Sequence, residues 1–413
     1  MRVLEAADRV GGKMRTTPRD GFVVDQGAFF LPSTHRTLLS LANEAGIGDQ
    51  VVPGGFVLAT VRDGRIHNLD GNRLVHAALS TRLLSTRAKL EAAKLLPEVI
   101  RARHAVYDRM PECGRYDTET LGAWAQHRFS PELREYLLDA TLRGIFATSA
   151  STAPRVDFLA ILALLKGAKL VAFRGGMGAY AQALARELEV RLHAEVLGVT
   201  PDADGVAVRW RDSENFEHVE HARACIVALP ARYTRAVLPD LDPWRRDFLQ
   251  RVRHGETFVL NVALKRSPPN VSATYIQVPQ AAHPFVTGIM LDHHKAPGRA
   301  PPGKGLLSVA VLDSWCAQHW RDSDERIRDN LLQAVDTLLP GTMQDAEFVE
   351  LHRWHQEYNT VGFYRDLGEF RRRCEEDTSI QLAGDFHSMQ NLEAATITGE
   401  RVARRLLAGS LLR

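Results

Sequence analysis

Hydrophobic positions divide the chain into short strand-like segments and longer helical ones. Residues 2–5 are mostly apolar and predict a short strand that ends at an acid. Residues 34–46 place apolar side chains at helical spacing and stop at a glycine, which predicts a helix. Residues 56–69 alternate around Asp63-Gly64, a pattern typical of a hairpin. The first part of the chain is therefore expected to mix strands and helices.

A long helical region is predicted next, from about residue 76 to 172. Asp117 or Thr118 is the expected N-cap of one of its helices. The apolar run at 158–173 is interrupted by two lysines and is too short to span a membrane, which takes about 20 residues. We expect a buried or amphipathic helix there, with a peripheral membrane contact as the alternative.

Strand–turn–helix patterns return later in the chain. Residues 173–188 predict a glycine turn that opens a helix, and short apolar strands follow up to residue 230. Residues 231–370 mix strands and helices, with a Pro- and Gly-rich surface loop expected at 295–305. From residue 380 the pattern indicates strand, loop and helix. These recurrences predict two domains, each built from segments that are not contiguous in sequence.

Composition narrows the class of protein. The 413 residues suggest two or three domains, and 45% hydrophobic with 25% charged residues is ordinary for a globular enzyme. A net charge of +2 gives no indication of nucleic-acid binding. The four cysteines form no CxxC pair and no signal peptide is visible, which favours a reducing, cytoplasmic location.

Two acids occupy positions typical of nucleotide-binding folds. Glu5 ends the first strand, where such folds place the acid that binds ribose, although an ordinary solvated glutamate would look the same. Gly176-x-Gly178, followed by Glu195, is a rival nicotinamide-type match. We do not favour a nicotinamide site here, because Glu195 falls inside a predicted strand and the pattern of residues 169–173 predicts a continuing helix.

The C-terminal region offers an anion-binding arrangement. Gly384 and Asp385 end an apolar strand, and a helix is predicted from about Leu392 or Glu393. A helix N-terminus has free N–H groups and a partial positive charge, which stabilise a bound anion. No histidine or cysteine spacing typical of a metal site occurs, and we expect no metal.

Taken together, the motifs resemble the FAD-dependent amine oxidase superfamily, which includes protoporphyrinogen oxidases and phytoene desaturases. The matching segments are VLEAADRVGGKMRT, GFVVDQGAFFL, FRGGMGAYAQALAREL, AEVLGV, CIVALP and LAGDFHSMQNLEAATITGERVA, in that order. The resemblance spans nearly the whole chain. It implies an α/β fold with a Rossmann-like FAD-binding domain and a mixed α+β substrate-binding domain.

The resemblance also implies domain boundaries. The FAD-binding domain would comprise residues 1–55, 174–230 and 375–413. The substrate-binding domain would comprise 56–173 and 231–374, with its helical part at about 76–172.

The resemblance implies a role for each matching residue. Glu5 would hold the adenosine ribose and the backbone of Val196 would meet the adenine. The pyrophosphate and flavin would be wrapped by Arg9, Gly11, Gly12 and Lys13, where Lys13 replaces the more usual arginine. Gly27 and Ala28 would lie near the isoalloxazine, and Gly384 and Asp385 near the ribitol and phosphate. The helix start at Leu392, Glu393 and Ala394 would point toward flavin N1 and C2=O.

One segment of the family pattern is not seen. A strand, GxGxxG and a helix precede the VLEA motif in the family, and Met1 stands where the family usually has valine. We expect a GTG codon read as the start, a missing first βα unit, and weak or absent FAD binding by the chain as written. The reading frame upstream of Met1 tests this expectation.

The reaction implied is hydride transfer from a hydrophobic or polycyclic small molecule to flavin N5, with oxygen or a quinone as electron acceptor. Amine oxidases of the superfamily usually carry a lysine in a strand that matches residues 254–266 here, and Val259 occupies its position. This favours porphyrinogen or polyene oxidation over amine oxidation.

Trp354 and Tyr358 are candidates for the substrate cavity and equally for ordinary core. A flavin-free interaction protein is the remaining alternative. No acid–base residue is singled out.

Overall fold

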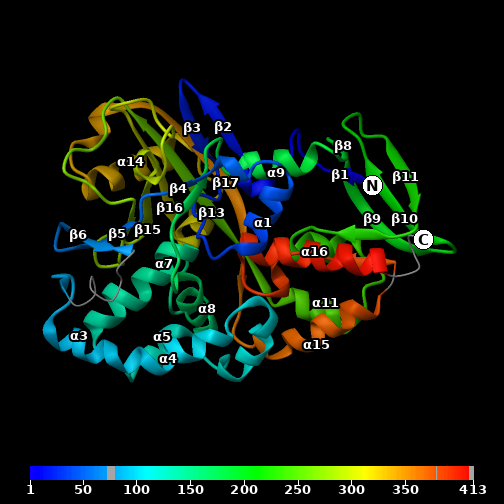
Figure 1. Ribbon diagram of the computed structural model, residues 1–413, viewed down its shortest axis with the longest axis horizontal. Coiled ribbons are helices and arrows are strands. Elements are labelled where there is room, and N and C mark those ends of the chain that lie inside the picture. The colour runs from blue at the N-terminus through cyan, green and yellow to red at the C-terminus, as the bar shows by residue number, and fades with distance from the viewer. Residues whose placement is uncertain (72–79, 378, 409–413) are drawn as a thin grey trace.

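A seven-stranded mixed sheet is the largest element of the computed structural model, which describes residues 1–71, 80–377 and 379–408. Helices α13 (Asp313–His319) and α14 (Asp324–Leu338) pack on it and bury an apolar core of Val, Ile and Leu side chains. Figure 1 shows α14 against this sheet. In order across the sheet, the strands are β17 (Ala346–Asn359), β13 (Val252–Leu264), β16 (Gly305–Val311), β15 (Val286–Leu291), β14 (Tyr275–Gln277), β5 (Val57–Arg62) and β6 (Arg65–Asp70).

The helical region lies below this sheet in Figure 1. Its core is formed by Leu, Phe and Trp side chains, with the apolar helix α8 buried along residues 156–161. The described helices here are α3 (Thr86–Ala92), α4 (Leu96–Arg101), α5 (Leu121–Gln126), α6 (Pro131–Leu133), α7 (Ala140–Phe146) and α8 (Arg155–Leu165). The predicted helical character of this region is confirmed for its described residues; 72–79 lie outside them.

Two parallel strand pairs lie on the other side of the molecule. The first, β1 (Arg2–Leu4) with β8 (Glu189–Arg191), joins the start of the chain to its middle. The second, β12 (Cys225–Val227) with β18 (Ile380–Leu382), joins the middle to the end. Among the described residues no strand links the pairs, and the absent first βα unit stays a prediction.

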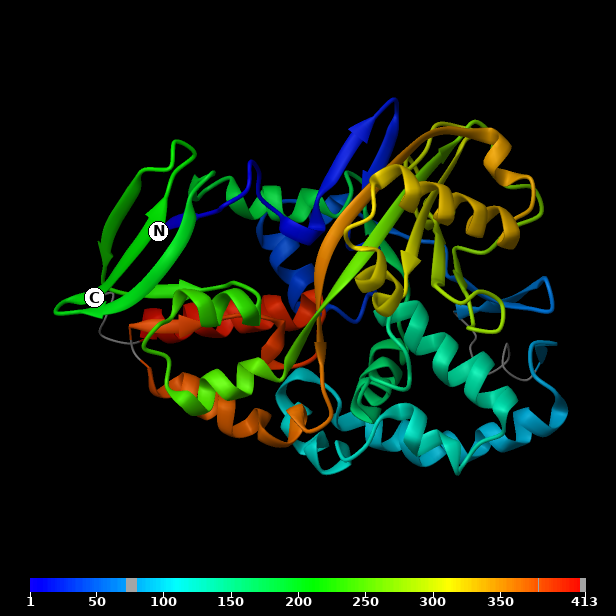
Figure 2. The same ribbon diagram turned by 180° about the vertical axis from the view of Figure 1, so that it is seen from behind.

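A small antiparallel sheet and several helices complete this side. Helix α16 (Leu392–Ala408) packs against α1 (Arg36–Glu44), and α15 (Phe363–Glu376) packs against α11 (Pro243–Gln250). Figure 2 shows the small sheet, α16 and α15 from behind. The small sheet consists of β9 (Glu195–Asp202), β10 (Gly205–Arg211) and β11 (Glu217–Ala222). The helices are α1 (Arg36–Glu44), α9 (Gly178–Ala185), α10 (Ala231–Val237), α11 (Pro243–Gln250), α15 (Phe363–Glu376) and α16 (Leu392–Ala408).

A buried ion cluster ties the N-terminal hairpin to the large sheet. Asp25, at the end of β3 (Phe22–Asp25), lies 2.9 Å from both the Lys295 ammonium and the Arg299 guanidinium. Asp292 receives a second Lys295 contact at 3.1 Å. All four side chains are fully buried. The prediction of a surface loop at 295–305 is therefore wrong for the start of this segment, because Lys295 and Arg299 are buried and paired with a carboxylate.

Two local predictions are corrected. The N-cap of α5 is Thr120, whose hydroxyl accepts from Ala123 N–H, and not Asp117 or Thr118. Asp117 is buried instead and accepts from the Tyr364 N–H. Residues Val171–Phe173 form strand β7, not a continuing helix, because α8 ends before the left-handed Gly167 (φ 70°). Strand β7 pairs antiparallel with β4 (Val51–Pro53).

The hairpin at β5 and β6 is confirmed, with Asp63 and Gly64 both at positive φ in its turn. No described helix is long and apolar enough to cross a bilayer. The four cysteines are free, and three of them are buried.

Candidate cofactor site

The glycine-rich segment after β1 forms a compact turn. Gly11 adopts a left-handed conformation (φ 111°) and a short 3₁₀ turn follows at Gly12–Met14. Gly12 is exposed and also has positive φ, and a side chain there would meet nothing within 4 Å. The backbone of this turn is therefore open on one side, as a close approach by a phosphate group requires.

Gly27 lies directly against this turn. The Ala28 N–H donates to the Lys13 carbonyl at 2.7 Å. A Cβ on Gly27 would come within 2.4 Å of the same carbonyl oxygen, so only glycine fits. The structure thus brings together Gly11, Gly12 and Lys13 with Gly27 and Ala28.

The Lys13 ammonium group points toward strand β17. Its hydrogen bonds, to the His355 carbonyl and the Gln356 side chain, are both long at 3.5 Å. Among the described residues no carboxylate forms an ion pair with it. Lys13 is therefore a cation whose charge is not neutralised by a direct contact.

Arg9 is directed toward the neighbouring hairpin of β2 (Thr16–Arg19) and β3. Its guanidinium donates to Gln26 Oε1 at 3.2 Å and Thr17 Oγ1 at 3.4 Å. Its Nε is buried and has no partner among the described residues. The Arg9 Nε is therefore a buried donor without a hydrogen bond in the described part of the chain.

Glu5 and Val196 lie in the same region. The Glu5 N–H donates to the Arg191 carbonyl, and the Glu5 carbonyl accepts from Ala194, two residues before Val196. The Glu5 carboxylate accepts from the Ala7 N–H at 2.8 Å, which fixes its direction at the end of β1. Val196 lies on β9 opposite Trp210.

Asp385 follows β18 and meets Glu357 of β17. The Glu357 side chain is buried, and its Oε1 accepts from the Ala231 N–H at 2.6 Å. Burial is the main cause that raises the pKa of Glu357 to about 8, and the negative charge of Asp385 is the second. Burial also raises the pKa of Asp385, against the influence of Lys13.

The N-terminus of α16 begins at Leu392, as predicted. Asn391 Oδ1 accepts from the Ala394 N–H at 2.7 Å. The N–H groups of Leu392 and Glu393 have no acceptor among the described residues and face the space ahead of the helix. The Glu393 carboxylate is used elsewhere, since it accepts from Thr37 and Leu38 N–H at 2.8 and 2.9 Å.

The three candidates for the substrate cavity lie on the two longest strands. The Trp354 indole donates to the Gln26 carbonyl at 2.7 Å and so stands beside Gly27. Tyr358 is 5% exposed, with the Arg253 guanidinium 4.5 Å from its ring centre. Val259 is 6% exposed and pairs with His352. Only Trp354 contacts a neighbour of the predicted flavin residues.

The rival glycine motif does not form a free phosphate site. At the start of α9, the Met177 N–H donates to Asp25 Oδ1 at 2.9 Å and the Gly178 N–H to Thr16 Oγ1 at 2.8 Å. A Cβ on Gly176 would lie 2.3 Å from the Thr16 side chain. These glycines therefore allow β2 to pack closely on the helix. Glu195 is the exposed first residue of β9, not an interior strand residue as predicted.

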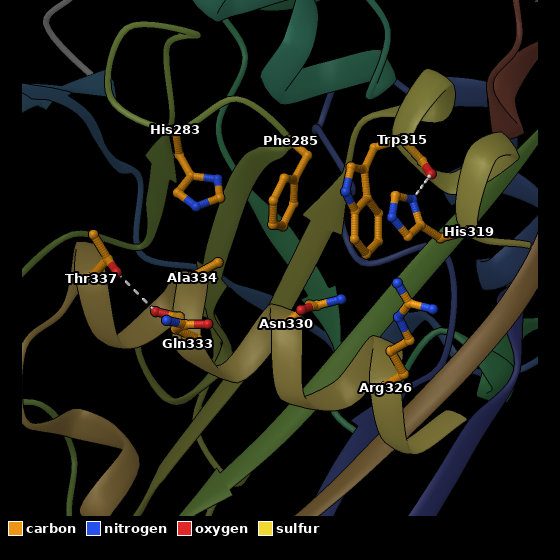
Figure 3. A pocket seen from close by; sticks show the side chains of 9 residues that line it. All are labelled: His283, Phe285, Trp315, His319, Arg326, Asn330, Gln333, Ala334 and Thr337. Carbon is orange, nitrogen blue, oxygen red and sulfur yellow. Dashed lines mark hydrogen bonds between the residues drawn. The ribbon is translucent and has the colours of Figure 1, made fainter. Parts of the chain in front are cut away.

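A hollow lies elsewhere, between α14, α13 and the segment that precedes β15 (Figure 3). It measures about 470 Å³ and none of the predicted cofactor residues lines it. Phe285, Trp315 and His319 stack in sequence along it, and the His319 Nδ1–H donates to the Trp315 carbonyl at 2.9 Å.

Sequence reasoning missed Glu357. Its local sequence pattern is the same as that of Glu350 on the same strand, which pairs with the surface cation Arg19. Only the approach of β17 to the loop after β18 distinguishes them.

The arrangement fits a flavin dinucleotide. An open glycine turn, a cation without a paired carboxylate and a free helix N-terminus are the groups that bind a diphosphate and stabilise negative charge on a flavin ring. Together with the mixed α/β fold, they define the class of flavin-dependent oxidoreductases.

Comparison with known proteins agrees with this class. The family model for flavin containing amine oxidoreductase matches residues 1–407, and the chain belongs to this family. The chain is 23% identical to polyamine oxidase 4 of Oryza sativa subsp. japonica over 383 residues, covering 88% of this chain and 72% of that protein. It is 25% identical to protoporphyrinogen oxidase of Bos taurus over 467 aligned positions, covering 98% and 92%.

Solved structures show the same fold. Cyclohexylamine oxidase from Brevibacterium oxydans IH-35A superposes with a TM-score of 0.78 at 15% identity, covering 100% of this chain and 94% of that one. The predicted superfamily, the flavin cofactor and the oxidoreductase activity are thereby confirmed.

Proposed function

We propose that this flavin-dependent oxidoreductase oxidises a hydrophobic or polycyclic small molecule, in the manner of protoporphyrinogen oxidases or phytoene desaturases. The observation that carries the proposal is that strand β13 has Val259, and not a lysine, at one position. It is buried in β13 at the position where the sequence resemblance expects the amine oxidase lysine. Lys265 follows β13 after its last residue, Leu264. Its N–H donates to the Asp345 carbonyl, away from the cofactor residues.

The position of Lys295, which is fully buried, also favours a hydrophobic substrate over an amine. Its ammonium is held by Asp25 and Asp292 in the ion cluster described above. A lysine held by two buried carboxylates is fixed in place, so it does not replace the absent strand lysine.

The proposed cofactor placement gives each residue a definite task. The FAD-binding domain is formed by 1–55, 174–230 and 375–413, the segments that the β1–β8 and β12–β18 pairs bring together. Glu5 binds the ribose, Lys13 and Arg9 bind the phosphates, and the α16 N-terminus orients the flavin ring. When bound, FAD accepts the hydride at N5.

The remaining segments, 56–173 and 231–374, form the proposed substrate-binding domain. From β17, the Trp354 indole donates to the carbonyl of Gln26, the residue before Gly27, so its ring is the best-placed of the three candidate cavity residues. The apolar helix α8 supplies a hydrophobic wall, since its later residues Leu162–Leu165 are only partly buried.

Anaerobic mixing of FAD-loaded protein with candidate substrates tests the proposal. A reduced tetrapyrrole or a polyene is expected to bleach the flavin absorbance, and putrescine and cyclohexylamine are expected to leave it unchanged. Bleaching by the amines alone would overturn the proposal in favour of amine oxidation, the second candidate, which the polyamine oxidase similarity favours. Re-oxidation by oxygen or by a quinone then identifies the electron acceptor.

Flavin content separates both candidates from a flavin-free interaction protein. Under that third alternative, fluorescence titration with FAD would show no saturable binding.

A further inference from the structure

Asn359, the last residue of β17, is buried in contact with the loop that leads into α16. Its Nδ2 donates to the Ser388 carbonyl at 3.1 Å and to the Tyr364 hydroxyl at 2.8 Å. Its Oδ1 accepts from the Gln390 side-chain amide. Because a carbonyl can only accept, the contact with Ser388 fixes which way the Asn359 amide faces. Both N–H groups and the oxygen of this amide are therefore in use.

The loop at 388–390 is held from one side only. Among the described residues, every hydrogen bond that reaches 388–390 from outside the 385–391 segment comes from Asn359. Asn391 follows directly and caps α16 by accepting from the Ala394 N–H at 2.7 Å. The Asn359 amide thus acts on the chain immediately before the first turn of α16, where two N–H groups have no acceptor in the described part of the chain.

Tyr364 and Asp157 hold Asn359 from the other side. The Tyr364 hydroxyl accepts from Asn359, so its single proton is left for the Asp157 carboxylate, which accepts it at 2.5 Å. The Tyr364 backbone is fixed as well, since its N–H donates to Asp117 at 2.7 Å. Asp157, Tyr364 and Asn359 are all buried, where a polar group that loses its partner is costly. A buried chain of hydrogen bonds therefore runs from α8 to the loop before α16.

We propose that Asn359 is a positioning residue for the flavin cofactor, and that Tyr364 and Asp157 hold its amide in the required orientation. The proposal rests on the proposed placement of the flavin ring ahead of α16. The N–H groups of a helix start stabilise negative charge only where they point at it. By holding the loop at 388–390, Asn359 sets the direction of these N–H groups without contacting the flavin itself.

Hydrogen–deuterium exchange of the protein without added FAD tests the anchoring. Tyr364→Phe keeps the ring and removes the hydroxyl, so Asn359 and Asp157 each lose a partner. Exchange of a peptide covering 388–395 is expected to rise about tenfold, while exchange of the small sheet of β9, β10 and β11 stays unchanged. Asn359→Leu, which removes the amide, is expected to give at least as large a rise. If Asn359→Leu does not fold, Tyr364→Phe decides the test.

Two control variants separate this chain of hydrogen bonds from general effects of substitution. Asp157→Asn keeps a side-chain oxygen that accepts from Tyr364, so exchange at 388–395 is expected to stay within about threefold of wild type. Tyr233→Phe removes the hydroxyl of an exposed tyrosine on α10 and is expected to match wild type.

The bound flavin tests the positioning role. In Tyr364→Phe and Asn359→Leu, the FAD dissociation constant is expected to rise about three- to tenfold. At saturating FAD, the reduction potential of the bound flavin is expected to fall below the wild-type value, because the negative charge of the reduced ring is less well stabilised by the helix start. A merely structural role would lower protein stability and leave this potential unchanged.

Different results overturn different parts. Unchanged exchange at 388–395 in Asn359→Leu overturns the anchoring, and unchanged exchange in Tyr364→Phe overturns the part of Tyr364 and Asp157. Increased exchange together with a wild-type potential overturns the role of Asn359 toward the flavin. If wild type binds no FAD, the proposed cofactor placement fails, while the exchange data still decide whether Asn359 holds the loop.

Discussion

Asp25 is the residue at which the N-terminal hairpin is anchored in the large sheet. Burial by itself would raise the pKa of Asp25, but Lys295 and Arg299 outweigh it and hold the pKa below its usual range. The carboxylate also accepts from the Thr16 hydroxyl and the Met177 N–H, so four groups converge on it.

Asp25→Asn is therefore expected to destabilise the protein by about 3–5 kcal/mol, because two buried cations lose their common partner. Chemical denaturation followed by circular dichroism measures the change. Asp20→Asn, in the exposed turn of the same hairpin, is the control and should stay within about 0.5 kcal/mol. Equal stability of the two variants would show that Asp25 does not anchor the hairpin.

Asp157 gives a pH dependence of stability. It is buried on α8 and accepts a 2.5 Å hydrogen bond from Tyr364. Burial raises its pKa to about 7. A carboxyl group with a raised folded-state pKa stabilises the protein fully below its unfolded value near 4, and this contribution is lost as the pH rises toward 7.

Wild type should therefore lose unfolding free energy between pH 4 and 7 more steeply than Asp157→Asn, by up to about 1.4 kcal/mol per pH unit. Denaturant titrations at several pH values measure both slopes. Parallel curves for wild type and variant would contradict the raised pKa of Asp157.

At the residue scale, sequence reasoning succeeded where a motif fixes local geometry. Gly27 and Lys13 belong to separate motifs, and the structure places them in direct contact. It failed where partners are distant in sequence. Lys295 looked like a solvated loop cation, and nothing near it in sequence indicates Asp25, which lies 270 residues away.

At the element scale, the N-termini of α9 and α16 differ in whether protein side chains already accept from their N–H groups. The start of α9 is occupied by Asp25 and Thr16, whereas the start of α16 keeps two N–H groups without an acceptor among the described residues. Both looked alike in sequence. The difference comes from β2 and β3, which pack onto α9 and bring side-chain caps with them.

Helix α1 depends on α16 through Glu393. The Glu393 carboxylate caps the first turn of α1 by accepting from two N–H groups, and a negative charge there also complements the helix dipole. The N-cap residue of α1 itself, His35, contributes no side-chain hydrogen bond.

Glu393→Ala is expected to lower the unfolding free energy by about 1–2 kcal/mol through loss of this cap. Thermal and chemical denaturation measure the effect. The control is Glu400→Ala on the same helix, whose exposed pair with Arg404 is worth at most about 0.5 kcal/mol. A Glu393→Ala variant as stable as Glu400→Ala would rule out the capping role.

For the whole molecule, strands β13 and β17 connect the large sheet to the proposed cofactor site. They pair along 13 positions, from Leu264 and Ala346 in the sheet to Val252 and Asn359. At that end, the Asn359 side chain donates to Ser388, ahead of α16. The order of motifs predicted the superfamily and its fold class. It did not predict this long pair, because strand length depends on partners that local pattern does not specify.

FAD binding by the purified chain tests the central claim most directly. Fluorescence titration should show saturable, weak binding by wild type. Lys13→Gln should weaken it at least about tenfold, or about 1.4 kcal/mol, because the diphosphate loses its cation. Lys166→Gln, in an exposed position beyond α8, should bind as wild type does. No saturable binding by wild type, or equal binding by Lys13→Gln, would contradict the account.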